Sequence, residues 1–121
     1  MNSNNDVKIF MDACEQTEVG FGNQADLYRR LIREEFDELM RAYFGKDMVE
    51  IADGCADLKW VIEGLEHTLQ LPQQAIWNEV SRSNLSKISS TGKVLKREDG
   101  KVLKPEGWSP PDIEKILKEQ V

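Results

Sequence analysis

The order of apolar and polar positions predicts a chain built mainly of helices. Apolar residues recur at spacings of three and four over residues 5–18, 24–44 and 46–70, and again after Pro72. That spacing is the period of an amphipathic helix. Proline suits the first turn of a helix, so we expect a fourth helix to start there and the helical part to reach about residue 89.

The third predicted helix carries the clearest apolar stripe. Its members alternate at spacings of four and three, as in the seam of a helical bundle: Ile51, Cys55, Leu58, Ile62, Leu65 and Leu69. Gly54 and Gly64 interrupt the same helix, and each costs about 1 kcal/mol relative to alanine. Close approach of another helix or of a ligand would explain both glycines.

Single residues predict where the helices end. Gly20 and Gly22 are expected to end the first helix, and Asn23 to cap the second. Residues 43–46 (YFGK) indicate a helix end and a tight turn. The second and third helices therefore form an αα-hairpin.

The pattern changes in the last third of the chain. Two Lys-Val-Leu-Lys segments, at 93–96 and 101–104, flank Asp99-Gly100, and Asp-Gly between alternating residues predicts a β-hairpin. Prolines and a glycine then interrupt regular structure, and residues 112–119 predict a short helix.

The expected fold is all-α: a bundle of four main helices, followed by a short C-terminal β-hairpin or arm and a terminal helix. We expect one domain over residues 1–121, with a helical core at about 5–89 and the arm at about 90–121. Without 18 consecutive apolar residues, no transmembrane helix is expected. Cys14 and Cys55 are expected to be buried free thiols in the cytoplasm.

Charge is distributed unevenly along the chain. Residues 1–80 hold 7 Lys/Arg against 16 Asp/Glu, whereas residues 81–121 hold 9 against 6. An acidic body suits duplex nucleic acid poorly, because nucleic acid requires a continuous basic face. The distribution suits a site that holds a metal ion in one part and phosphates in another.

Two acidic clusters lie on either side of the predicted turn. Spacings of three and four place the members of each cluster on one helix surface: Glu34, Glu35 and Glu38, then Glu50, Asp53 and Asp57. At about 1.5 Å per residue, the clusters lie roughly 10–15 Å and 8–12 Å from the turn, nearly level with each other. Their repulsion calls for a cation or for raised pKa values, and hard oxygen ligands suit Mg²⁺ or Mn²⁺.

These residue types fit metal-assisted attack on a phosphoanhydride. Carboxylates can fix the metal and accept a proton from water. Basic and amide groups further along can bind a phosphate chain: Arg82, Asn84, Lys87 and Lys104. A solvated acidic surface is the alternative, and spacing alone leaves both interpretations open.

Several segments resemble a known family. Residues 30–39 (RLIREEFDEL) and 50–57 (EIADGCAD) are similar to the E-E-x-x-E and E-x-x-D signature of the MazG-like all-α NTP pyrophosphohydrolases. Residues 79–87 (EVSRSNLSK) and 97–104 (REDGKVLK) resemble the phosphoribosyl-ATP pyrophosphohydrolase-like branch, as do FMDACEQ at 10–16 and PPDI at 110–113.

The resemblance implies an α-helical homodimer or homotetramer that hydrolyses a nucleoside triphosphate to monophosphate and pyrophosphate. By motif, it implies Mg²⁺ ligands at Glu35, Glu38, Glu50 and Asp53, and a base or further ligand at Glu34. It implies substrate contacts at Asn84 and Lys87, with Arg82 and Lys104 as additional candidates. Asp57 is a candidate to extend the metal site.

Three functions remain to be separated. The leading hypothesis is a Mg²⁺-dependent pyrophosphohydrolase that removes non-standard or deoxy-nucleoside triphosphates. The second is hydrolysis of phosphoribosyl-ATP, and the third is a non-enzymatic nucleotide-binding or dimerisation module, which would bind nucleotide without turnover. Neither nucleic acid nor a membrane is an expected partner.

The three tryptophans have different expected environments. Trp60 and Trp77 lie in helical patterns and are expected to pack in the core. Trp108 lies in the Pro/Gly-rich arm, where it can either anchor the arm or contact the substrate.

Overall fold

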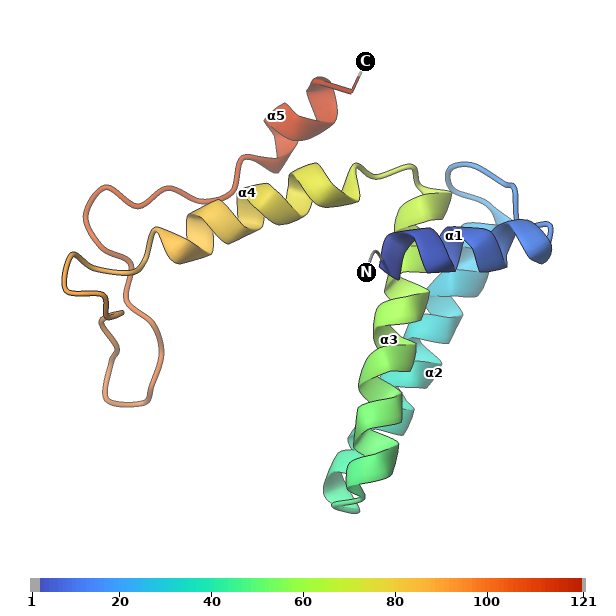
Figure 1. The fold of residues 1–121 in the computed structure, drawn as a ribbon, viewed down its shortest axis with the longest axis horizontal. Helices are drawn as coiled ribbons and strands as arrows, with labels where there is room; N and C mark the ends of the chain where they lie inside the picture. Colours follow the sequence, from blue (N-terminus) through green and yellow to red (C-terminus); the bar gives the residue numbers. More distant parts are fainter. Residues whose placement is uncertain (1–2, 121) are drawn as a thin grey trace. The chain divides into compact units, whose positions relative to one another are not determined.

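The computed structural model describes residues 3–120, and its described part is helical with no β-sheet (Figure 1). The helices are α1 (Ser3–Ala13), α2 (Asn23–Phe44), α3 (Met48–Thr68), α4 (Gln73–Leu85) and α5 (Ile113–Lys118). The all-α expectation and its four main helices are therefore confirmed. Every helix in the described residues is too short or too polar to span a bilayer.

The chain divides into two compact units between Leu71 and Pro72. The first unit contains α1, α2 and α3, and the second contains α4, the C-terminal tail and α5. The expectation of one domain over residues 1–121 stays a prediction.

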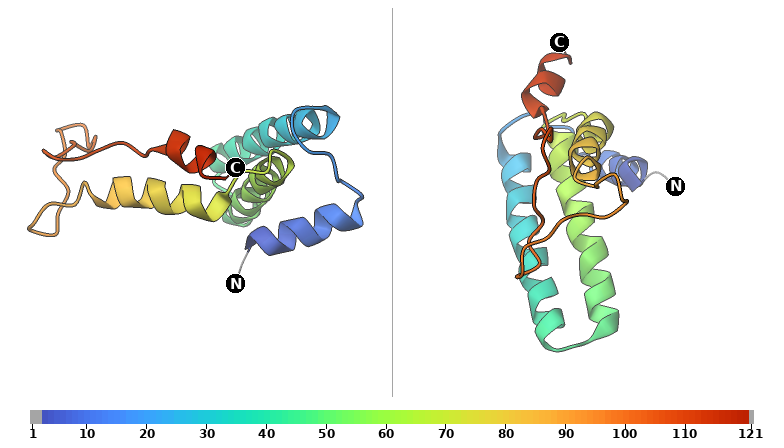
Figure 2. Two further views of the ribbon diagram at one scale, coloured as in Figure 1. Left: turned by 90° about the horizontal axis from the view of Figure 1, so that it is seen from above. Right: turned by 90° about the vertical axis from the view of Figure 1, so that its left-hand side faces the viewer.

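In the first unit, α2 and α3 form a long antiparallel hairpin, and α1 packs against α3 (Figure 2). Each helix contributes to the core: Val7 and Met11 from α1, Tyr28 from α2 and Val61 from α3. Partly buried apolar residues surround this centre: Leu31, Ile32, Leu58 and Leu65. The hairpin predicted from the spacing around residues 43–46 is thus present.

Two glycines allow α3 to approach α2 closely. A Cβ added at Gly64 would lie 2.1 Å from Cε1 of Tyr28, and one added at Gly54 would lie 3.3 Å from Cδ1 of Leu39. The Tyr28 ring therefore occupies the space that any side chain at Gly64 would need. Helix approach, one of the two expected explanations, accounts for both glycines.

The packed face of α3 differs from the apolar stripe predicted from the sequence. Gly54, Val61 and Gly64 are buried, whereas Cys55 and Ile62 are exposed, Ile62 by 41%. The packed face is therefore rotated toward the glycines, because the absence of Cβ there permits the closest contact. The prediction of buried thiols is also wrong, since Cys14, just after α1, and Cys55 in α3 are both free but exposed.

Helix α1 ends at Ala13, well before the expected residue 18. Glu15 adopts a left-handed φ of 59°, and the N–H of Gln16 donates to the carbonyl of Met11 at 2.9 Å. This is a Schellman ending without its usual glycine. Lys46 after α2 and Gln70 after α3 adopt the same conformation, with φ of 54° and 53°.

The predicted roles of three boundary residues were wrong: Gly20 and Gly22 do not end the first helix, and Asn23 does not cap the second. The left-handed turn after α1 ends that helix earlier, and α2 begins at Asn23 with Gly22 as its N-cap residue. A loop side chain performs the capping: Oε1 of Glu18 accepts from the N–H of Gln24 at 3.2 Å. Local sequence pattern does not reveal this contact, because Glu18 lies outside the usual capping positions.

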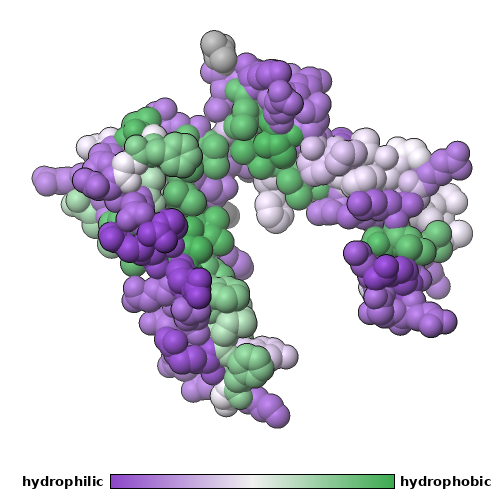
Figure 3. Space-filling model, turned by 180° about the vertical axis from the view of Figure 1, so that it is seen from behind, coloured by the Kyte–Doolittle hydropathy of each residue, from purple (hydrophilic) through white to green (hydrophobic). Residues whose placement is uncertain are grey.

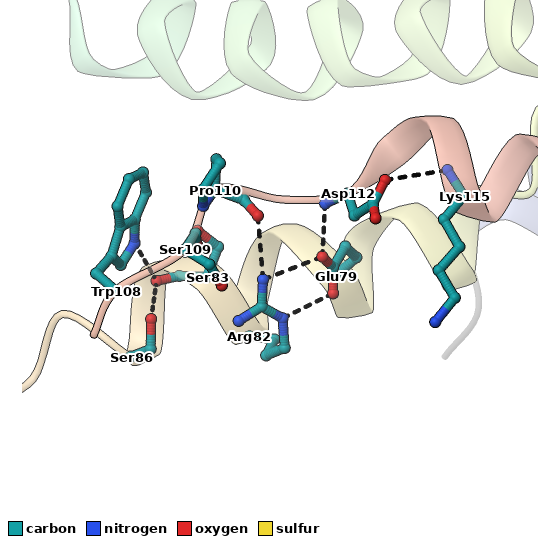
Figure 4. Close-up of polar contacts among 9 residues, drawn as sticks. All are labelled: Glu79, Arg82, Ser83, Ser86, Trp108, Ser109, Pro110, Asp112 and Lys115. Atoms are coloured by element: carbon teal, nitrogen blue, oxygen red, sulfur yellow. Dashed lines mark hydrogen bonds and ion pairs between the residues drawn. The ribbon is translucent and has the colours of Figure 1, made fainter.

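In the second unit, the tail folds back along α4 (Figure 4). Ser83 is buried in α4 with 1% exposure, and its hydroxyl donates to the carbonyl of Ser109 at 2.9 Å. The indole N–H of Trp108 donates to the carbonyl of Ser83 at 3.0 Å. Asp112 caps α5 by accepting from the N–H of Lys115, so the predicted terminal helix is confirmed.

The C-terminal β-hairpin was predicted wrongly. The turn at Gly100 forms, with φ of 87° and the N–H of Arg97 bonded to the carbonyl of Lys101 at 2.8 Å. The described residues before and around this turn contain only isolated antiparallel bridges, between Ile88 and Val94 and between Lys96 and Val102. The apolar side chains there remain exposed, and a two-stranded ribbon without a covered face is marginal in water.

Much apolar surface remains exposed in the first unit. It follows the α2–α3 hairpin (Figure 3), where the exposed large apolar residues include Phe36, Tyr43, Phe44, Met48, Val49 and Ile62.

Core packing was also wrongly expected for Trp60 and Trp77. Trp60 is 38% exposed and pairs edge-on with Phe10, and Trp77 is 69% exposed.

Candidate functional site

The turn between α2 and α3 places the acidic positions. Asp47 caps α3 by accepting from the N–H of Glu50 at 3.2 Å. Both carboxylates lie at a helix N-terminus, where the backbone dipole favours negative charge. This cap fixes the start of α3 and with it the height of Glu50 relative to the end of α2.

A hollow of about 550 Å³ lies beside this turn. It is lined by Glu38, Arg41, Ala42, Gly45, Asp47 and Glu50. The structure therefore brings Glu38 of α2 and Glu50 of α3 to one surface, as the hairpin spacing predicted. Arg41 and Asp47 also line the hollow, although the motif comparison did not assign them a role.

Higher on the hairpin, Glu35 lies in an acidic environment. Burial raises the pKa of its carboxyl above the ordinary value, and the charges of Glu38, Asp57 and Glu34 raise it further. Asp57 belongs to α3, so the repulsion acts across the helix pair as well as along α2. This is the raised pKa that the facing clusters implied.

Asp57 shares the same environment. Burial is the main cause of its raised pKa, followed by the charges of Asp53 and Glu38. The charge of Glu38 thus raises the pKa of both half-buried carboxyls, and Glu38 also lines the hollow with Glu50. Asp57 was not among the four predicted metal ligands. Its spacing of four from Asp53 nevertheless placed it on the same surface of α3.

The donor chemistry fits a divalent cation. Oε2 of Glu35 is shielded from solvent and has no hydrogen-bond partner among the described residues, and a shielded carboxylate oxygen is costly without a partner. Within residues 3–120, however, no three Asp, Glu, His or Cys side chains converge closely enough to hold a metal ion. Binding would require these carboxylates to turn toward one point.

The second unit groups the predicted phosphate contacts. Nζ of Lys87 donates to Oδ1 of Asn84 at 3.1 Å. The Nζ atoms of Lys87 and Lys104 lie 5.5 Å and 4.6 Å from the centre of the Trp108 ring. Two of the four predicted contacts therefore lie at the Trp108 indole, and a third, Asn84, is bonded to Lys87. The sequence left Trp108 open between an anchor of the arm and a substrate contact.

Arg82, the fourth predicted contact, is engaged with the tail (Figure 4). Its Nε lies 2.8 Å from Oε1 of Glu79, and a terminal nitrogen donates to the carbonyl of Pro110 at 3.2 Å. Glu79 also accepts from the N–H of Asp112 at 2.6 Å. Arg82 and this backbone N–H together lower the pKa of Glu79 to about 2. Sequence reasoning missed Glu79, although its spacing of three from Arg82 is a recognised helix pairing.

A helical chain whose central hairpin gathers carboxylates from two helices has the pattern of the all-α, MazG-like pyrophosphohydrolases. The model of the phosphoribosyl-ATP pyrophosphohydrolase family matches residues 10–84, more than half of the chain, and the protein belongs to this family. The family is one of hydrolases that cleave a nucleotide phosphoanhydride, and its MazG-like members typically use divalent metal ions. A search of the curated proteins found no match.

Proposed function

We propose that this protein hydrolyses a nucleoside triphosphate between its α and β phosphates, with Mg²⁺, to give a nucleoside monophosphate and pyrophosphate. One observation carries the proposal: Glu38 lines a hollow with Glu50 across the hairpin, and its charge raises the pKa of half-buried carboxyls on both helices, Glu35 and Asp57. Non-standard or deoxy-nucleoside triphosphates are the proposed substrates, and removal of such nucleotides from the pool is the proposed role.

The carboxylates of the hairpin have separate proposed tasks. Glu35, Glu38, Glu50 and Asp53 would hold Mg²⁺, with Mn²⁺ as a substitute, and Asp57 would support them from α3. The bound ion would neutralise phosphate oxygens and make a water molecule more acidic. Glu34, exposed on α2, would accept the proton of that water.

The second unit would bind the phosphate chain. Asn84 offers an amide, and Lys87 and Lys104 offer ammonium groups, which are strong donors to phosphate oxygens. Arg82 remains a predicted contact, but its present partners assign it first to holding the tail.

Phosphoribosyl-ATP is a second candidate substrate, and the description of the matching family favours it. The same bond would break, between the α and β phosphates, and the same carboxylates would act. The two candidates therefore differ in what binds beyond the phosphates and not in the chemistry of the hairpin.

The test is a substrate panel. Purified protein with Mg²⁺ should release pyrophosphate from at least one member of a panel of ribo- and deoxy-nucleoside triphosphates or from phosphoribosyl-ATP, and chelation should abolish release. Glu38→Gln and Asp53→Asn should each reduce kcat/KM at least about 100-fold, because a metal ligand is lost.

The matched control is Asp37→Asn, whose carboxylate pairs with Arg33 on α2 instead of joining the acidic cluster. This variant should retain activity within about twofold. Nucleotide binding without turnover, unchanged by metal, would contradict the proposal and favour a nucleotide-binding module.

A further inference from the structure

Trp108 is held rigidly for a residue in an irregular tail. Its indole N–H donates to the carbonyl of Ser83 at 3.0 Å. The hydroxyl of Ser83 in turn donates to the carbonyl of Ser109, the residue after Trp108, at 2.9 Å. Ser83 is almost completely buried, so two hydrogen bonds shielded by α4 fix both the backbone beside Trp108 and the plane of its ring (Figure 4).

The fixed ring holds two ammonium groups. Nζ of Lys104 lies 4.6 Å from the ring centre and Nζ of Lys87 lies 5.5 Å from it. Both distances fall within the range of cation–π attraction. The ring attracts each ammonium group without neutralising its charge, and the two like charges still repel each other.

Neither lysine has an acidic partner. In the part of the chain that the structure describes, no carboxylate forms an ion pair with Lys87 or Lys104. Both arginines of this unit are paired, since Arg82 contacts Glu79 and Arg97 contacts Asp99 at 2.7 Å. The positive charges of Lys87 and Lys104 beside Trp108 are therefore available to an anion, whereas those of the two arginines are not.

We propose that Trp108 is a positioning residue, which holds the ammonium groups of Lys87 and Lys104 as a pair for the oxygens of one polyphosphate chain. The anion would bind between the two ammonium groups and relieve their repulsion. This inference rests on the proposed function, in which both lysines contact the substrate phosphates. It adds that their placement depends on the indole and on its hydrogen bond to Ser83.

The first experiment measures the binding of inorganic tripolyphosphate to the full chain by calorimetry in metal-free buffer, where hydrolysis cannot occur. Trp108→Leu removes the ring and should weaken binding roughly tenfold. Trp108→Phe keeps a ring but loses the N–H donor, so its affinity for tripolyphosphate should lie between those of Trp108→Leu and the unaltered chain. Trp77→Leu removes an exposed indole from α4 of the same unit and should bind like the unaltered chain.

The second experiment is steady-state kinetics on the best substrate of the panel. Trp108→Leu should raise KM roughly tenfold and change kcat less than about twofold, because the ring holds ground-state contacts and not the reacting atoms. Equal KM values for Trp108→Leu and Trp77→Leu would overturn the inference. A fall in kcat at unchanged KM would overturn it as well.

A spectroscopic measurement applies even if Trp108→Leu fails to fold. In the Trp60→Phe/Trp77→Phe chain, Trp108 is the remaining tryptophan. Tripolyphosphate should shift its emission as the ammonium groups turn toward the anion, and an unchanged spectrum at saturation would contradict the proposal. If the chain hydrolyses no nucleotide yet binds tripolyphosphate through Trp108, the proposed function fails and the anion site stands.

Discussion

The contact between Gly64 and Tyr28 shows how one missing side chain sets the distance between two helices. The ring lies where a Cβ would have to be, at 2.1 Å from its ideal position. Tyr28 is itself buried and bonds through its hydroxyl to Gln16. The ring therefore cannot move aside without disturbing the contact between α2 and the α1–α2 loop.

Gly64→Ala should lower the free energy of unfolding by about 1–3 kcal/mol, because the added methyl group overpacks this contact. Urea denaturation followed by circular dichroism measures the change. The control is Gly54→Ala, where the nearest atom, Cδ1 of Leu39, lies at 3.3 Å and can shift slightly. Equal losses in the two variants would contradict the role assigned to Tyr28.

Glu35 should destabilise the metal-free protein at neutral pH. Its pKa is raised above the ordinary value near 4.5 in the folded state, so the folded chain binds the proton more tightly than the unfolded chain. The stability that this proton contributes is present below about pH 4.5 and is lost as the pH rises through the folded pKa.

Glu35→Gln should therefore stabilise the metal-free protein at pH 7 by about 0.5 kcal/mol, through relief of the repulsion with Glu38 and Asp57. The gain should disappear near pH 4, and added Mg²⁺ should raise the melting temperature of the unaltered chain more than that of the variant. Glu34→Gln, at an exposed neighbouring position, serves as the control. A loss of stability at pH 7 would show that the charge of Glu35 is not repelled.

Residue spacing predicted that Glu38 and Glu50 lie at one surface, but it predicted the packed face of α3 less well. Glu38 and Glu50 meet because the turn is short and the helix rise is constant, and both quantities can be obtained from the sequence. Val61 is buried instead of Ile62 because Gly54 and Gly64 draw α2 to their side of α3. A periodicity of apolar residues depends on large side chains. It therefore does not detect a close helix contact made at glycines, which have no side chain.

At the scale of elements, the tail of the second unit is held to α4 by the group of Glu79, Arg82 and Asp112. Glu79 accepts from both partners, and its pKa is lowered from 4.5 to about 2. A group with a lowered pKa contributes stability that is present above its unfolded value. That contribution is lost as the pH falls through about 2.

Acidification from pH 5 to pH 2 should therefore release the tail from α4, and Glu79→Gln should loosen it at neutral pH. Hydrogen exchange of the amide of Asp112, which donates to Glu79, measures the release. Asp99→Asn removes the ion pair with Arg97 in the same unit and should leave that amide protected. Equal protection in Glu79→Gln and the unaltered chain would show that this group does not hold the tail.

The tail also shows where sequence prediction of elements ends. The turn at Asp99-Gly100 formed because it depends on local preferences, namely a left-handed glycine and an aspartate that accepts from the N–H of Lys101. The strands on either side did not form, since strands require a covered face that two Val-Leu pairs cannot provide. Burial of Trp108 against Ser83 was likewise a long-range contact that no local pattern encodes.

At the scale of the whole molecule, we expect the chain to assemble as a homodimer or homotetramer. The first unit exposes an apolar surface along α2 and α3 (Figure 3), and large exposed apolar patches mark association surfaces. Light scattering after size exclusion should give two or four times the chain mass. Ile62→Ser, within that surface, should shift the mass toward that of one chain. A single-chain mass for the unaltered protein at all concentrations would contradict this expectation.

The residues that end the first three helices lower the stability of the chain below what it could reach. Glu15, Lys46 and Gln70 each hold a left-handed backbone conformation that costs a side-chain-bearing residue about 1 kcal/mol or more. Glycine is the residue that adopts it most easily. Three positions outside the acidic cluster thus retain a reserve of unused stability. Such positions are expected in a protein selected only to remain above a stability threshold, and glycine at them would add stability that offsets the cost of substitutions favouring a new substrate.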